Sequence, residues 1–187
     1  MSANVAPIPK NTGKTYFYFP TQVGTGWVYE QNWGDDYVET VTAVEEKGGR
    51  YLVTVATTSL DDPDGLQPGI MRYLVSEEGV FVTSSALESE TDRKEHDPPF
   101  RLLKLPFRAG DKWGSAESSG GESVMAKIET VKVPAGTFET IRVDGRVAPN
   151  QIGEGNYSFW YAPRVGAVKK KVNDKLIQMK SITLPEK

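Results

Sequence analysis

Two groups of acidic residues have a composition that could bind a metal ion. The loop Asp61-Asp62-Pro63-Asp64-Gly65 has the carboxylate density of a calcium loop. It lacks the bidentate glutamate that such a loop requires, and aspartates in turns commonly bond to their own backbone. The second group surrounds the only histidine and comprises Glu88, Glu90, Asp92, Glu95, His96 and Asp97. Charge-rich segments are usually solvated, so we predict no metal site, with calcium binding at residues 61–65 left open.

Residues that could perform catalysis do not form a recognisable pattern. A Ser-His-acid triad would have to use His96, which lies in the most loop-like segment and follows no nucleophile-elbow motif. Carboxylates for glycoside hydrolysis are plentiful, but spacing alone selects no pair. The glycines of Gly120-Gly121 and Gly153-Glu154-Gly155 open no helix and therefore predict no phosphate cradle. We predict no catalytic residues and no enzyme, with a carboxylate-dependent hydrolase as the weakest alternative.

Composition excludes several other kinds of site. The 187 residues include one histidine and no cysteine, which excludes disulfides, thiol nucleophiles, and thiolate or multi-histidine metal sites. With 22 basic and 25 acidic residues the net charge is −3, so nothing favours nucleic acid or anionic lipid as a partner. We predict no cofactor. The run Lys169-Lys170-Lys171 falls on an expected strand, and we interpret it as edge protection or a solvated face.

The sequence shows no segment that would direct it to a membrane. It contains no run of about 18 apolar residues, so we expect no transmembrane segment. Residues 1–14 contain no apolar core of the kind found in signal peptides. Whether a signal sequence was removed is left open.

The elements that must position these residues are predicted to be strands, because side-chain character alternates with a period of two. Trp27, Tyr29 and Trp33, for example, share one face of the first expected strand. Segment 88–99 is expected to be a solvated crossing, and 100–107 a strand or one helical turn. The remaining expected strands are 27–33, 37–46, 51–58, 70–75, 80–84, 112–118, 123–133, 137–147, 157–161, 165–172 and 175–184. We predict an all-β, mostly antiparallel fold, either a sandwich or an open (half) barrel.

The most specific feature of the sequence is an internal repeat. Phe19-Pro20-x-x-Val23-Gly24-x-x-Trp27 recurs as Leu105-Pro106-x-x-Ala109-Gly110-x-x-Trp113. Two further pairs of motifs follow at nearly the same offset, around Tyr51/Phe138 and Tyr73/Trp160. We expect one domain, 1–187, built from two similar half-sheets, 16–87 and 102–172, with Trp27 and Trp113 in equivalent buried positions. Residues 88–101 would link the halves, and 175–184 would be an extra strand.

These motifs resemble uncharacterised bacterial secreted or lipoprotein-like β-sheet families. The resemblance covers residues 17 to about 172. It is carried by Phe19-Pro20…Gly24…Trp27-x-Tyr29, Val133-Pro134-Ala135-Gly136-Thr137-Phe138 and Trp160-Tyr161-Ala162-Pro163-x-Val165-Gly166-x-Val168. It implies an exported or envelope protein, periplasmic or extracellular, and carries no activity over. The signal sequence and lipobox cysteine expected of such families have no counterpart in this sequence.

The 19 aromatic residues are the remaining candidates for ligand binding. Aromatics that recur in both halves, such as Trp27 and Trp113, are expected to be scaffold. Four aromatics have non-aromatic counterparts in the repeat: Trp33, Tyr37, Tyr157 and Phe159. We predict that these four gather around one concavity and bind an apolar ligand, since tyrosine and tryptophan suit the mouth of a sheet. Filling an asymmetric core is the other role open to them.

These observations predict a non-enzymatic, envelope-type β protein that binds an apolar small molecule in a concave sheet face. The alternative is a structural or interaction module of a cell-envelope assembly, with an envelope protein as its partner. A large apolar-lined cavity would favour the first function, and a packed core with an exposed patch would favour the second. A deep cleft with two facing carboxylates would favour the hydrolase.

Overall fold

The computed structural model describes residues 17–60, 69–86, 90–114, 121–148 and 154–185. These residues form strands and one short 3-10 turn, η1 (Glu90–Asp92). No helix in these ranges is long and apolar enough to cross a bilayer. The strands are β1 (Gly26–Gln31), β2 (Tyr37–Lys47), β3 (Arg50–Ser59), β4 (Gly69–Ser76), β5 (Gly79–Ala86), β6 (Lys94–Lys104), β7 (Lys112–Gly114), β8 (Glu122–Val133), β9 (Gly136–Val147), β10 (Gly155–Ala162), β11 (Gly166–Val172) and β12 (Lys175–Thr183).

Tight turns join many of these strands into hairpins. Gly48 and Gly49 connect β2 to β3 with backbone φ angles of 60° and 75°. Positive φ at both central residues is what a type I′ hairpin turn requires, and glycine adopts it without strain. The hairpin turn expected at Gly48-Gly49 is therefore found between β2 and β3.

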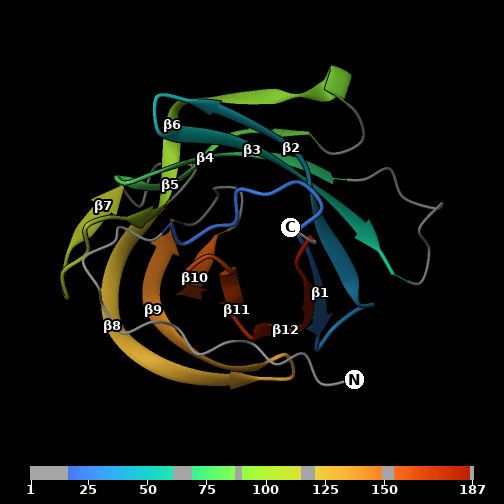
Figure 1. Cartoon of the computed structure of the whole chain (residues 1–187). Coiled ribbons are helices and arrows are strands. Elements are labelled where there is room, and N and C mark those ends of the chain that lie inside the picture. Colours follow the sequence, from blue (N-terminus) through green and yellow to red (C-terminus); the bar gives the residue numbers. More distant parts are fainter. Residues whose placement is uncertain (1–16, 61–68, 87–89, 115–120, 149–153, 186–187) are drawn as a thin grey trace.

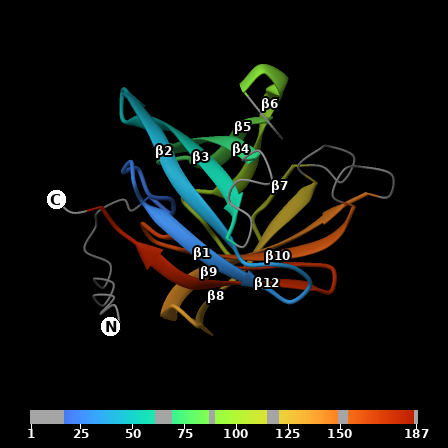
Figure 2. The same cartoon turned by 90° about the vertical axis from the view of Figure 1, so that its right-hand side faces the viewer.

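All twelve strands belong to one sheet, in the order β6-β5-β4-β3-β2-β1-β12-β11-β10-β9-β8-β7. Every pairing is antiparallel, so the predicted all-β, antiparallel class is confirmed. The sheet is rolled until it is nearly closed into a barrel. Strands β2 to β6 form the upper wall in Figure 1 and β7 to β12 form the lower arc. Figure 2 shows β1 lying beside β12, where the two walls are joined.

One seam remains in the barrel, between β6 and β7. These two strands end the sheet and share no hydrogen-bonded ladder. The indole N–H of Trp113 on β7 donates a hydrogen bond of 2.8 Å to the carbonyl of Arg101 on β6. Trp113 is only partly buried at this seam, whereas Trp27 is 2% exposed. The two tryptophans therefore do not share the equal burial that we expected.

The strand order consists of two consecutive six-strand meanders, β1–β6 and β7–β12. Residues 94–101, expected to lie in a linker, belong to β6 instead. The linker was expected because of its charges and Pro98-Pro99, but β6 is an edge strand, where proline and charged residues are tolerated. Strand β12, expected to be an extra strand, ends the second meander as β6 ends the first. Duplication of the two halves stays a prediction.

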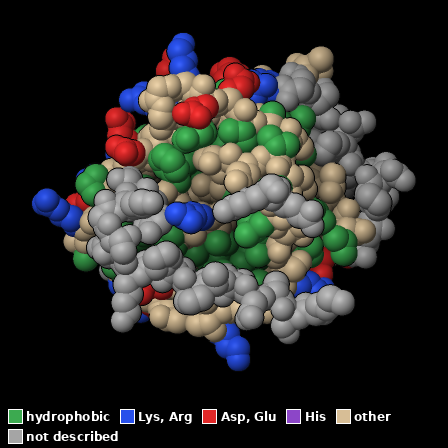
Figure 3. Space-filling view, viewed as in Figure 1, with side chains coloured by type: hydrophobic (Ala, Val, Ile, Leu, Met, Phe, Trp, Pro, Cys, Tyr) green, Lys and Arg blue, Asp and Glu red, His purple; other side chains and the backbone are tan. Residues whose placement is uncertain are grey.

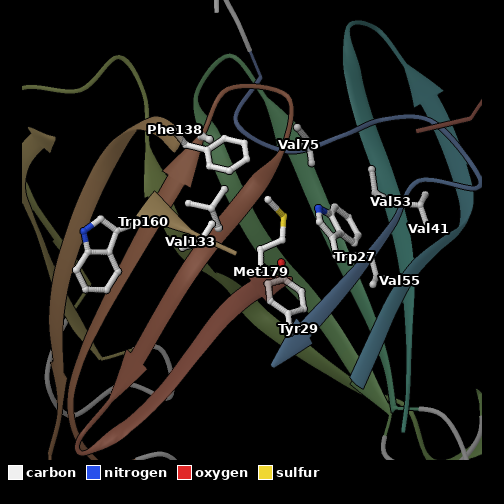
Figure 4. Packing of buried hydrophobic residues seen from close by; sticks show 12 residues of the cluster. Trp27, Tyr29, Val41, Val53, Val55, Val75, Val133, Phe138, Trp160 and Met179 are labelled. Carbon is white, nitrogen blue, oxygen red and sulfur yellow. The ribbon is translucent and has the colours of Figure 1, made fainter. Parts of the chain in front are cut away.

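The core lies between the two meanders. Its largest fully buried side chains include Trp27, Tyr29, Phe138 and Met179, and Figure 4 shows this cluster. The polar tips of two of these rings are satisfied by backbone of the opposite half. Trp27 donates to the carbonyl of Val165 at 2.8 Å, and Tyr29 donates to the carbonyl of Ala167 at 2.7 Å. Large aromatic rings can thus be buried without leaving a donor unpaired.

Candidate ligand-binding cavity

A cavity of about 190 Å³ lies inside the rolled sheet. Both meanders contribute to its walls, because the sheet closes around it. Most of the wall is apolar or aromatic, and hydrophobic side chains gather around the middle of the face seen in Figure 3. The apolar wall includes Phe19, Met71, Val82, Phe100, Leu102 and Phe159.

A lysine–glutamate pair forms the polar part of the cavity wall. Lys170 on β11 and Glu39 on β2 are joined at 2.9 Å, with side chains that are 19% and 18% exposed. The ammonium group lies 4.2 Å from the centre of the Tyr29 ring and 3.5 Å from the hydroxyl of Tyr37. Two opposite charges in direct contact can be removed from water together, whereas either alone would be very costly to bury.

The pair sets the charge state of the cavity. Burial alone would lower the pKa of Lys170, but the carboxylate of Glu39 opposes this and, with the nearby tyrosines, brings the pKa well above its usual value. Burial raises the pKa of the Tyr73 and Tyr161 hydroxyls. Among the described lining residues, Lys170 is therefore positively charged at neutral pH and paired with the Glu39 carboxylate, and the phenols of Tyr73 and Tyr161 are neutral.

The tyrosine hydroxyls around the pair differ in their hydrogen bonds. Tyr29 donates to the Ala167 carbonyl, and Tyr37 accepts from Lys170. The hydroxyls of Tyr73 on β4 and Tyr161 on β10 have no hydrogen-bond partner among the residues that the structure describes. Both of these rings line the cavity. Two donors are thus left available on its wall.

The four predicted site residues lie at different distances from the cavity. Phe159 lines it. Tyr37 and Tyr157 lie one ring behind the wall: Tyr37 stacks on Tyr29 at 5.2 Å, and Tyr157 stacks on Phe159 at 5.1 Å. Trp33 follows the end of β1, is 42% exposed and packs beneath the ammonium of Lys175. Three of the four are therefore brought near the cavity, and Trp33 is not.

Sequence reasoning missed the polar part of the wall. Lys170 was interpreted as edge or solvated surface, but β11 is paired on both sides and its neighbours Lys169 and Lys171 do not line the cavity. The alternation of a strand was the available signal, since it separates Lys170 from the lysines on either side. Tyr73 was assigned to the scaffold because it recurs in the repeat, yet it lines the cavity as well.

A second hollow lies at a turn-rich end of the molecule, with a volume of about 440 Å³. Its lining is mostly polar and includes Arg146, Glu154, Asn156 and Asn173. The side chain of Asn173 accepts from the backbone N–H of Asn156 at 3.0 Å and donates to the carbonyl of Glu154. The Asn173 side chain is thus already hydrogen-bonded to the backbone of two other lining residues, and we place the candidate site in the inner cavity.

Potential metal ligands are dispersed in the part of the chain that the structure describes. No three histidine, aspartate or glutamate side chains there are grouped so that they could hold an ion. The Asp61–Gly65 loop lies outside the described residues, as do Glu88 and the side chain of Glu90.

Comparison with known proteins identifies the fold. No family model matches the sequence, and no curated protein matches it. A protein from Bacteroides fragilis, assigned as exported and described as having a YmcC-like fold, matches with a TM-score of 0.62 and 17% identity, over 90% of this chain and 100% of that one. A protein from Parabacteroides distasonis, assigned as a lipoprotein, matches with a TM-score of 0.59 and 16% identity, over 91% and 100% of the two chains. The chain therefore shares the YmcC-like fold.

Proposed function

We propose that this chain is a non-enzymatic, exported or envelope-type protein that binds a small apolar ligand inside its rolled sheet. The observation that carries this proposal is the apolar cavity between the two meanders. Small-molecule sites are typically concave and apolar, with a few polar groups that fix orientation. Phe159 would contact the ligand, and Tyr37 and Tyr157 would support the rings that do so.

The size of the cavity limits the ligand. A cavity of about 150 Å³ lined by apolar side chains can bind benzene, and the volume here is about 190 Å³. We therefore infer a ligand with one ring or a short acyl chain. The two proteins with the same fold, assigned as exported and as a lipoprotein, support a periplasmic or extracellular location.

An enzymatic role receives little support from the cavity. Glu39 is the carboxylate among its lining residues, and Lys170 already engages it. A carboxylate-dependent hydrolase needs two carboxyl groups facing the scissile bond.

Toluene binding tests the proposal, because a ligand that binds only the folded state raises the unfolding temperature. Ala167 lines the cavity, so Ala167→Leu should fill it and abolish the toluene-dependent shift. Ala43 on β2 is exposed and does not line the cavity, so Ala43→Leu is the matched control and should keep the shift of the parent. Trp33→Ala should also keep it. An absent shift, or the same shift in Ala167→Leu, would overturn the proposal.

A second candidate function, an interaction module, is favoured by the edge of β8. Strand β7 pairs only with Glu122, Ser123 and Val124 of β8, so the rest of that edge has no ladder partner among the described strands. Ile128 on this stretch is 54% exposed. Unpaired edges accept an additional strand, and an extended segment of an envelope protein would fit here. Ile128→Lys should weaken the capture of such a partner without changing toluene binding.

A further inference from the structure

We propose that the ligand is a neutral carbonyl compound, whose oxygen accepts hydrogen bonds from Tyr73 and Tyr161 while its apolar part lies against Phe159. This inference rests on the proposed function and names the chemical class of its ligand. It starts from the two hydroxyls on the cavity wall that have no partner among the described residues.

The two hydroxyls come from different meanders and line the same cavity. Tyr73 is on β4 of the first meander and Tyr161 is on β10 of the second. Both rings line the same cavity, and so does Lys170 of the ion pair. A ligand in the cavity would therefore meet both donors next to the ion pair.

Their hydrogen-bonding capacity points to an acceptor on the ligand. A phenol at neutral pH can donate one hydrogen bond, and the cavity-facing hydroxyls of Tyr73 and Tyr161 donate none to the residues that the structure describes. Tyr29 in the wall and Tyr37 behind it both have hydrogen-bond partners within the protein, so tyrosine hydroxyls in this region are not unpaired in general. An oxygen with two lone pairs can accept from both Tyr73 and Tyr161.

The charge of the cavity selects a neutral acceptor over an anion. Lys170 is already paired with Glu39 at 2.9 Å, so the lining residues that the structure describes carry no net charge. A carboxylate ligand would add a buried negative charge without a free counterion, which is costly. A ketone, ester or amide carbonyl has the same acceptor oxygen without this cost. The apolar remainder of such a molecule would lie against Phe100, Leu102 and Phe159.

Three compounds of similar size separate the alternatives by isothermal titration calorimetry at pH 7. Toluene has no acceptor, acetophenone has a neutral carbonyl, and benzoate carries a charge. We expect acetophenone to bind about tenfold more tightly than toluene, as a net gain from hydrogen bonding. Benzoate should bind more weakly than either. Equal binding of toluene and acetophenone, or tightest binding of benzoate, would overturn this inference.

Variants then assign the effect to the two hydroxyls. Tyr73→Phe and Tyr161→Phe should each lower the acetophenone preference, and the double variant should remove it while toluene still binds. Tyr51 lies outside the cavity lining and packs on Phe17, so Tyr51→Phe is the matched control and should retain the preference. If the preference survives in the double variant, the inference fails, even though the proposed function stands. If no compound binds the parent protein, the proposed function itself fails.

Discussion

Lys170 is the residue whose environment departs most from the usual behaviour of its type. Lysine is rarely buried without a partner, and here the partner comes from the other meander, on β2. The ammonium also lies over the Tyr29 ring at 4.2 Å, which adds a cation–π contact. The pair therefore adds a charged link between the two meanders to the hydrogen bonds that Trp27 and Tyr29 make across them.

Removing one charge of this pair should be strongly destabilising. We expect Lys170→Met to cost about 3–5 kcal/mol in the free energy of unfolding, because it leaves the Glu39 carboxylate buried without a counterion. Urea unfolding at pH 7 measures this loss. The neighbouring Lys171 is exposed, so Lys171→Met should stay within about 0.5 kcal/mol of the parent.

The double variant Glu39→Gln/Lys170→Met checks the cause. It should recover much of the stability that Lys170→Met loses, since no unpaired charge then remains. A double variant as unstable as the single one would mean that packing of the lysine side chain, rather than its charge, accounts for the loss.

At the scale of elements, one hairpin contains a strand glycine covered by an aromatic ring. Gly145 on β9 is directly opposite Tyr157 on β10. A Cβ atom at position 145 would collide with the ring of Tyr157. The hydroxyl of Tyr157 is in turn fixed by a hydrogen bond of 2.7 Å to Ser123 on β8. The ring thus fills the space left by the missing side chain and holds β8, β9 and β10 together.

Alanine at this position should therefore be destabilising. We expect Gly145→Ala to cost about 1–3 kcal/mol, because the Tyr157 ring must move and lose its stacking on Phe159. Gly69 on β4 is the matched control, since a Cβ there would meet only Thr57 at 4.0 Å. Gly69→Ala should be neutral or slightly stabilising through the unfolded chain. Equal urea midpoints for the two variants would contradict this account.

The local pattern of the sequence was sufficient to predict most strands, but it did not identify the polar residues of the candidate site. Period-two alternation and turn glycines such as Gly48-Gly49 predicted most strand positions to within a few residues. Residues 94–99 were missed, because proline and charge are typical of loops and an edge strand cannot be recognised before the strand order is known. Lys170 was missed for a related reason: its partner Glu39 is 131 positions away in the sequence, and no local pattern contains that pairing.

For the whole molecule, the buried tyrosines should make the free energy of unfolding decrease as pH rises in the alkaline range. Burial raises the pKa of Tyr29, Tyr73 and Tyr161 above the usual value of 10.0. Above this pH the unfolded chain releases protons that the folded protein retains, so the free energy of unfolding falls as pH rises. Each such tyrosine contributes a slope of up to about 1.4 kcal/mol per pH unit. The stability that these tyrosines contribute is thus complete below about pH 10 and decreases above it.

Urea unfolding at pH 8 and pH 11 measures this dependence. The difference between the two pH values should be smaller in Tyr73→Phe/Tyr161→Phe, because two of the raised groups are removed. The part of the 295 nm phenolate absorbance that Tyr73→Phe/Tyr161→Phe lacks should appear in the parent together with unfolding rather than before it. If these tyrosines ionise while the protein stays folded, the explanation is wrong.

The position of the seam also has a consequence for the folding rate. Among the described strands, the ladder between β1 and β12 is the one pairing between strands that are not consecutive in the chain. A circular permutant that joins the ends of residues 17–185 through a short linker and opens at Arg108, between β6 and β7, would place the strands in the order β7 to β12, then β1 to β6. Every ladder would then connect neighbours in the chain, which lowers the contact order. Two-state domains with lower contact order fold faster, so stopped-flow refolding of the permutant should be faster than that of the parent.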